Sequence, residues 1–213
     1  MPNARIDGFD FTLFYDYDCH RDHFLPKLSD DGKIEWLEAR MRMIFIRPLS
    51  LLFDRGSSVF EQLERPINGL PSTSTLVSVS TLMNGIEALG SFLTHRKSAK
   101  RQNFTAFMNK YMLEWCLLVP SPRHNNRKLP LAEILWKAYR NGLTHSFAIT
   151  GAGVDVVNGS DKFKIDGDAL QIDIWKFFPD FRSAVDRMFE DVRKDKKIRT
   201  SFLKRFSYVY ACS

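Results

Sequence analysis

Several features that would assign the protein to a class at once are missing from its sequence. No apolar run reaches the roughly 20 residues that a helix needs to cross a bilayer, because Arg42, Arg47 and Pro48 interrupt the longest candidate, at residues 41–53. The N-terminus also lacks the apolar core of a signal peptide. We therefore expect a cytoplasmic protein that has no membrane-spanning segment.

Cysteine is scarce as well. The three cysteines stand at positions 19, 116 and 212, and their odd number and wide spacing fit neither a disulfide framework nor a zinc site. Residues 19–23 include Cys19, His20 and His23, but the segment lacks a helical pattern that would bring these ligands together. We expect reduced thiols, no metal site and no cofactor.

Two further enzyme signatures are absent. Gly151 and Gly153 follow a candidate strand, but no helix with another glycine comes after them, so they indicate a turn and not a dinucleotide site. No serine lies in a nucleophile elbow. What the chain does have is 213 residues, 44% of them hydrophobic, which suits one globular domain. Its net charge of +6 favours a polyanionic partner such as nucleic acid.

Apolar residues recur at helical spacing along most of the chain. Pro48 should kink or end the first helix, and Pro130 suits the first turn of the fourth. The serine, threonine and glycine content of the second helix indicates close packing against another helix. The pattern predicts five helices, over about residues 33–53, 74–94, 103–118, 130–141 and 180–194.

The pattern changes between the last two predicted helices. Residues 146–157 and 162–177 alternate apolar and polar side chains, with glycine-containing turns between them, which predicts two or three short antiparallel strands. The fold class is therefore mainly α, a helical bundle with a small antiparallel β appendage, about residues 146–177, before the last helix. We assign residues 1–33 to an irregular N-terminal arm and 34–213 to a single helical domain.

The end of the fourth predicted helix carries the residues with the clearest chemistry. Arg140 keeps its charge and presents a fork that fits phosphate, and His145 titrates near neutral pH. These two groups suffice for RNA cleavage in which the ribose 2′-hydroxyl is the nucleophile. Five positions along a straight helix turn the chain by about 140°. The two side chains can meet only if the helix ends near Gly142 or if a symmetric dimer brings them together.

The Arg140–His145 run resembles the signature of the HEPN superfamily, in which an arginine and a histidine stand a few residues apart. A polar residue often follows the arginine in that family, and Asn141 does so here. Residues 84–90 are similar to the earlier HEPN helix whose acidic residue, here Glu87, can lie near the arginine. The resemblance covers roughly residues 74–195, and the N-terminal arm and the β appendage depart from a minimal HEPN domain.

The resemblance implies a function. HEPN domains are helical and commonly dimerise, and many are metal-independent endoribonucleases in defence, toxin–antitoxin or RNA-processing systems, whereas others bind nucleotide, RNA or a protein partner without catalysis. Carried over, His145 would be the acid/base, Arg140 the phosphate clamp and Asn141 a phosphate contact, in a cleft between two copies. An antitoxin or regulatory protein would be a further partner.

Structural interpretations stay open beside the functional one. Arg140 could pair with Glu87 or Glu133 inside the bundle, and His145 could cap a helix end. Tyr139 could be a core residue or could stack on a base. The basic residues near the predicted helix ends could contact RNA phosphates or form an ordinary solvated surface; these are Arg96, Lys97, Arg101, Arg123, Arg127 and Lys128.

Overall fold

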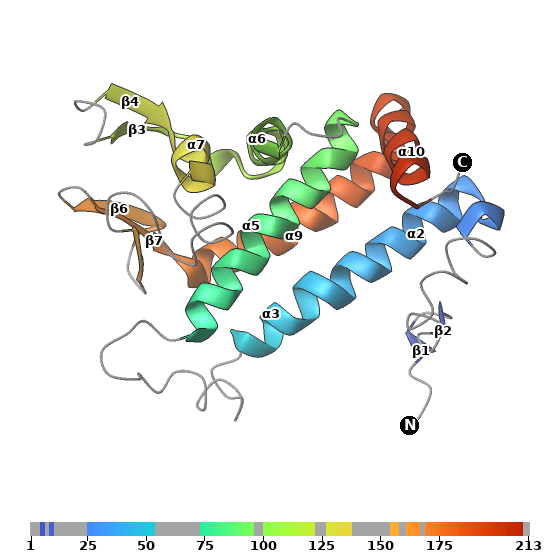
Figure 1. The fold of residues 1–213 in the computed structure, drawn as a ribbon, viewed down its shortest axis with the longest axis horizontal. Coiled ribbons are helices and arrows are strands. Elements are labelled where there is room, and N and C mark those ends of the chain that lie inside the picture. Colours follow the sequence, from blue (N-terminus) through green and yellow to red (C-terminus); the bar gives the residue numbers. More distant parts are fainter. Residues whose placement is uncertain are drawn as a thin grey trace.

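The structure is a computed structural model of the 213-residue chain. It describes residues 5–6, 9–10, 25–53, 73–95, 100–121, 127–137, 154–157, 161–166 and 169–210. The fold is mainly helical with small β elements, as the sequence predicts. Three long helical segments run side by side, and most of the strands gather at one end of them (Figure 1).

The first long segment begins with α2, Asp30–Met41, and follows a 3-10 turn, η3, at Leu25–Lys27. Ser29 caps α2 by accepting a hydrogen bond from the Gly32 N–H at 3.0 Å. The helix continues through a π-helical turn, η4 at Arg42–Ile46, into α3 at Arg47–Leu52. Pro48 was predicted to kink or end the helix. The wider turn before it lets the chain continue without the N–H that proline lacks.

The second long segment is α5, Thr73–Thr94, which packs against α6, Lys100–Tyr111. The two helices lie so close that a side chain at Gly90 would overlap the Asn103 carbonyl oxygen. The Thr94 hydroxyl also donates a hydrogen bond to the Asn103 side chain. Close packing of the second predicted helix is therefore confirmed.

The third long segment is α9, Ile174–Lys194, followed by α10, Lys196–Tyr210. The last predicted helix was expected to start after Pro179, but α9 starts six residues before position 180. Buried Asp173 explains the early start, because its carboxylate accepts the N–H groups of Trp175 and Lys176 at 2.9 and 3.3 Å. Asp195 caps α10 in the same way, so the basic C-terminal segment is a second helix after the appendage.

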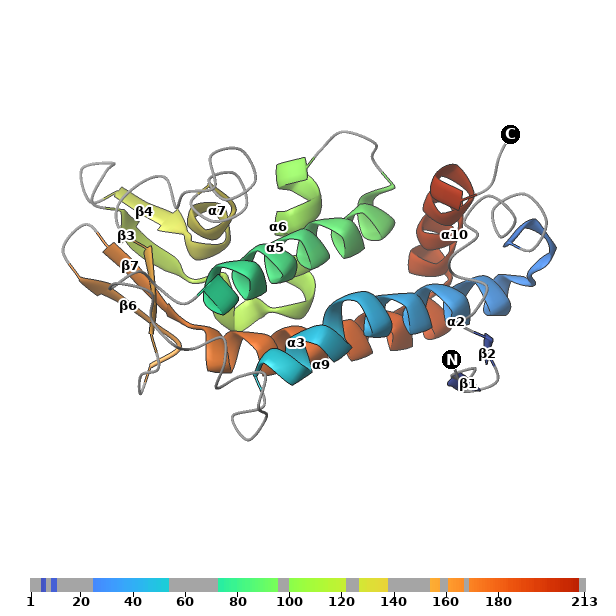
Figure 2. The ribbon, with the colours of Figure 1, turned by 60° about the horizontal axis from the view of Figure 1, so that its bottom comes forward.

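The core lies between these helices. Helix α9 runs beneath α5 and beside α2 and α3 (Figure 2), and it turns one continuous apolar stripe toward them. The stripe comprises Phe177, Phe181, Ala184, Val185, Met188, Phe189 and Val192, all of them buried. Helix α10 joins the core through Phe202 and Phe206, whose rings pack on Phe92 and Trp36.

The segment after α6 differs from the prediction. The third helix was expected to reach residue 118, but α6 ends at Tyr111 and a 3-10 turn, η5 at Leu113–Trp115, follows. Trp115 accounts for the break, because its ring packs on Phe177 and its indole N–H donates to Asp180 at 2.9 Å. Strands β3, Leu118–Ser121, and β4, Arg127–Pro130, then form an antiparallel pair that sequence reasoning missed.

The β appendage predicted near residues 146–177 is present. Strands β5, Val154–Val157, β6, Phe163–Asp166, and β7, Ala169–Asp173, form one sheet in the order β5-β7-β6. Strands β6 and β7 are antiparallel as predicted, whereas β5 pairs with β7 in parallel. The short strands β1, Arg5–Ile6, and β2, Phe9–Asp10, form a further antiparallel pair within the N-terminal arm.

None of the helices in the described ranges is both long enough and apolar enough to cross a bilayer.

Candidate functional site

The Arg140–His145 motif lies outside the described residues, and so do Tyr139 and the basic residues Arg96, Lys97 and Arg123. The predicted roles of these residues remain predictions. The structure does describe the chain immediately before the motif: helix α7, Leu131–Leu135, and a π-type turn at residues 136–137. The residues around this helix are therefore the described part of the candidate site.

Helix α7 is firmly held against the rest of the molecule. Leu131, Ala132 and Leu135 are fully buried, and the Leu131 N–H donates to the Leu117 carbonyl oxygen at 2.8 Å. Pro130 occupies the N-cap position, close to where the sequence predicted a helix start. In Figure 1, α7 lies between α6 and the β3–β4 pair. The chain that enters the motif therefore starts from a fixed position beside α6.

One predicted RNA-binding residue is placed at this contact. The Arg101 guanidinium, near the start of α6, forms an ion pair of 2.7 Å with Glu133 of α7. About half of the Arg101 side chain stays exposed. Arg127 and Lys128 lie exposed on β4, the strand that runs directly into α7. The structure thus brings residues from two separate basic segments to the same end of the molecule.

The cations at this end are poorly neutralised. Within the described ranges, Lys100, Arg127, Lys128 and Lys137 form no ion pair. The sequence agrees, because residues 95–145 hold ten lysines and arginines against two carboxylates, a net charge of +8 when the whole chain has +6. All of the excess positive charge of the protein therefore comes from this segment.

A pocket of about 820 Å³ opens between α6 and α7, and we call it the α6–α7 pocket. Apolar side chains form one part of its wall and polar or charged side chains the other. The residues that line it are Lys100, Arg101, Gln102, Thr105, Asn109, Cys116, Pro130, Ala132, Glu133 and Trp136. Its volume is within the range of sites that hold small molecules or nucleotides.

Two groups of the pocket wall have unusual environments. Burial raises the pKa of the Cys116 thiol to about 11, and the thiol contacts the Met112 carbonyl oxygen at 3.5 Å. Cys116 is therefore protonated at neutral pH and is a poor nucleophile. The indole N–H of Trp136 is buried and finds no hydrogen-bond acceptor in the described part of the chain. Buried donors without acceptors are uncommon in folded proteins.

Glu87, the acidic residue suggested for the site, lies on α5 with intermediate exposure. Arg140, its expected partner, is outside the described residues, so their proximity stays a prediction.

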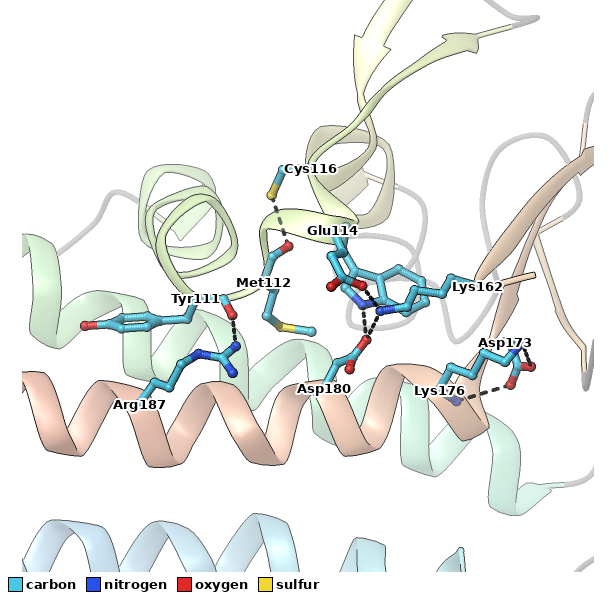
Figure 3. A network of polar contacts seen from close by, with 10 residues as sticks. Tyr111, Met112, Glu114, Cys116, Lys162, Asp173, Lys176, Asp180 and Arg187 are labelled. Carbon is cyan, nitrogen blue, oxygen red and sulfur yellow. Dashed lines mark hydrogen bonds and ion pairs between the residues drawn. The ribbon is translucent and has the colours of Figure 1, made fainter. Parts of the chain in front are cut away.

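Sequence reasoning missed a second polar cluster, around Lys162. Figure 3 shows the Lys162 ammonium between the carboxylates of Glu114 and Asp180, the latter 2.7 Å away. Burial lowers the pKa of Lys162, but the hydrogen bonds to the two carboxylates raise it by more, so the pKa lies above its ordinary value. The cluster ties the start of β6 to η5 and α9, and no motif around Lys162 signals it.

The Lys162 cluster borders a smaller pocket of about 330 Å³, near Tyr111 and Arg187. Its charged groups already have partners. Arg187 donates to the Tyr111 carbonyl oxygen (Figure 3), and Lys110 pairs with Asp191 at 3.1 Å. We interpret this region as structural.

No group of three or more histidine, cysteine or carboxylate side chains within the described ranges is placed to hold a metal ion. The Cys19–His23 segment lies outside those ranges. Comparison with known proteins adds no family: no family model, no curated protein and no solved structure matches the chain.

Proposed function

We propose that this protein is a HEPN-like endoribonuclease that needs no metal. The observation that carries the proposal is the Arg140–His145 run, which begins five residues after the end of α7, inside the one segment that holds the excess positive charge of the chain. A basic surface is the expected footprint of an enzyme that binds a polyphosphate chain. The mainly helical fold is compatible with the family.

The chemistry needs only groups that the motif supplies. The ribose 2′-hydroxyl attacks the adjacent phosphorus, and the bond from phosphorus to the 5′ oxygen breaks. His145 takes the proton from the 2′-hydroxyl or gives one to the leaving 5′ oxygen. Arg140, helped by Asn141, stabilises the additional negative charge on the pentacoordinate phosphate. The products are a 2′,3′-cyclic phosphate and a 5′-hydroxyl.

The proposal also includes the oligomeric state, the location and the regulation of the protein. We expect a cytoplasmic homodimer, with the motifs of both copies in one cleft, whose activity an antitoxin or regulatory protein restrains. Arg140 and His145 of one straight helix would face different directions. A symmetric dimer would bring an arginine and a histidine together in one cleft.

The first prediction tests catalysis. Purified protein in EDTA should cleave single-stranded RNA and leave cyclic phosphate ends, whereas His145→Ala and Arg140→Ala should each lower the rate by at least about 100-fold. Lys204→Ala, an exposed cation on α10, is the matched control and should keep the wild-type rate. Thermal unfolding of all variants shows that they are folded. Undiminished cleavage by His145→Ala would refute the proposed role.

The dimeric cleft has its own test within the same experiment. Mixing the two inactive variants allows hybrid dimers that contain one intact His145 and one intact Arg140. Partial recovery of cleavage is expected if the cleft uses residues of both copies, and no recovery is expected if each chain acts alone.

The alternative is a module that binds RNA, nucleotide or a protein partner without cleaving it. The cations near the α6–α7 pocket that form no ion pair with any described residue favour this alternative as much as they favour the enzyme, because they serve binding and not proton transfer. RNA affinity that survives in His145→Ala, with no cleavage by the wild-type protein, would select it.

A further inference from the structure

We propose that the α6–α7 pocket receives a nucleobase from a single-stranded RNA. This inference rests on the proposed function only in naming RNA as the ligand. It uses side chains of the pocket wall alone and no residue of the Arg140–His145 motif.

The shape and the apolar wall suit a flat, aromatic guest. A volume of about 820 Å³ is large enough for one nucleotide together with part of its neighbour. Pro130, Ala132 and Trp136 supply an apolar surface, on which a base can lie more favourably than in water. A base must leave its helix to enter such a pocket, which is why the ligand is single-stranded.

The opposite wall presents polar groups along one face of α6. Gln102, Thr105 and Asn109 are three and four residues apart, so they project to the same side of the helix. Side-chain amides carry both donors and acceptors and are typical partners for the edges of bases. The wall therefore offers stacking and edge recognition together.

Cations lie in the pocket wall and next to its lining residues in the sequence. Lys100 lies in the wall, Lys128 stands two residues before Pro130, and Lys137 follows Trp136 directly; all three are exposed and form no ion pair in the described ranges. Arg101 is about half exposed although it is paired with Glu133. Such positions suit phosphates on either side of an inserted base, because backbone charge dominates the affinity of RNA for proteins.

A comparison with the smaller pocket near Tyr111 explains why we assign the nucleobase to the α6–α7 pocket. It too has charged walls, but there each charge is used inside the protein, as in the Lys162 cluster with Glu114 and Asp180. The α6–α7 pocket instead keeps Lys100 in its wall without an ion-pair partner among the described residues. A negatively charged ligand that also forms hydrogen bonds with the polar side chains of α6 fits this difference.

The experiment measures how binding depends on one base at a time. Short 2′-O-methyl oligonucleotides, which cannot be cleaved by the proposed chemistry, carry a single abasic position that is moved along the strand. Affinity is measured by fluorescence anisotropy for the wild type and for Thr105→Tyr, which fills the pocket. Ser183→Tyr places the same bulk in the smaller pocket and is the matched control.

For the wild type and Ser183→Tyr, one abasic position should weaken binding about tenfold. Thr105→Tyr should bind the intact strand about as weakly as the wild type binds the abasic one, and should no longer respond to the missing base. A second variant, the double substitution Gln102→Ala and Asn109→Ala, removes the polar wall without adding bulk. If Thr105→Tyr fails to fold, this double variant tests the proposal in its place. It should reduce the loss of affinity that the abasic position causes.

The inference is overturned if no abasic position matters, if Thr105→Tyr keeps the response, or if duplex RNA binds as tightly as the single strand. These binding measurements do not depend on cleavage, so they can succeed even if the proposed catalysis is wrong. In that case His145→Ala would cleave RNA like the wild type in the separate cleavage assay, while the abasic position would still weaken binding at the pocket.

Discussion

Charged residues serve different purposes at two places in this molecule. Between α2 and α9, Glu38 accepts hydrogen bonds from Arg42 and Arg193, and Arg42 also pairs with Asp186 at 2.7 Å. We call these four residues the α2–α9 seam. Around the α6–α7 pocket, Arg101 has a carboxylate partner, but Lys100 and Lys128 have none in the described ranges.

The electrostatics of the seam show what pairing does. Burial raises the pKa of Glu38, but the hydrogen bonds and charges of Arg193 and Arg42 lower it by more, so the pKa lies below its ordinary value. The carboxylate is thus more stable in the folded protein than in the unfolded chain. Charge at the seam holds two helices together, whereas Lys100 and Lys128 near the pocket have no such partner among the described residues and are the groups that we propose to bind a polyanion.

The largest effect on stability and on the pocket is expected from a substitution that moves α6 away from α5. Helix α6 carries one wall of the pocket, so this change would also displace that wall. Gly90→Ala would place a methyl group on the Asn103 carbonyl oxygen, a backbone atom that cannot move aside. We expect a loss of about 3 kcal/mol in the free energy of unfolding, measured by urea denaturation. RNA affinity should fall with it.

Gly85→Ala is the matched control for that prediction. A side chain at Gly85 meets only the rings of Phe181 and Phe45, at 3.0 and 3.1 Å, and rings can shift. The loss should be about 1 kcal/mol or less, since alanine also favours a helix. Equal losses at the two glycines would show that the close helix crossing at Gly90 is not special.

The seam is tested next by Glu38→Gln. Removing a carboxylate that serves two arginines should lower the free energy of unfolding by about 1–2 kcal/mol at pH 7. Because the folded pKa of Glu38 is lowered, its contribution is complete above the unfolded pKa of about 4.3 and is lost as the pH falls through the folded value. In urea denaturation at decreasing pH, the stability difference between the two proteins should therefore shrink once the pH falls below the unfolded pKa of Glu38 and vanish below its folded pKa.

RNA affinity supplies the control for Glu38→Gln. The seam has no part in the proposed binding, so the affinity for the 2′-O-methyl strand should stay unchanged. A stability difference that persists undiminished in acid would contradict the pairing of Glu38 with its arginines.

The sequence predicted those helices whose apolar period agrees with their final packing. Helices α5 and α9 show this, because residues such as Val185, Met188 and Val192 recur at helical spacing and are all buried. The prediction failed where one tertiary contact decides the local structure. Trp115 ends a helical pattern by packing on Phe177, and Asp173 starts α9 ahead of Pro179, and neither effect can be read from local periodicity.

The candidate site could likewise be predicted only in part. Local chemistry pointed to Arg101 and Lys128 because both lie in basic stretches of the chain, and the structure brings these stretches together through the contact of Arg101 with Glu133. The pocket itself was not predictable, since its walls come from α6, from Cys116 after η5, and from α7 with the residues on either side of it. Thr105 and Asn109 carry no signal until the two helices are placed side by side.

The smallest predicted effect sharpens the comparison at the pocket. Glu133→Gln leaves the Arg101 guanidinium without its carboxylate, so it becomes available to a phosphate. The ion pair is partly exposed, and its loss should change the free energy of unfolding by no more than about 0.5 kcal/mol. RNA affinity should rise about threefold, with a salt dependence steeper by up to about one counterion.

Glu114→Gln is the matched control, because it removes the same charge from the Lys162 cluster beside the smaller pocket. If RNA responds only to the net charge of the protein, the two substitutions should raise affinity equally. If the α6–α7 pocket is where the strand lies, Glu133→Gln should raise it and Glu114→Gln should not. Anisotropy titrations of both variants at two salt concentrations therefore separate a located binding site from a merely basic protein.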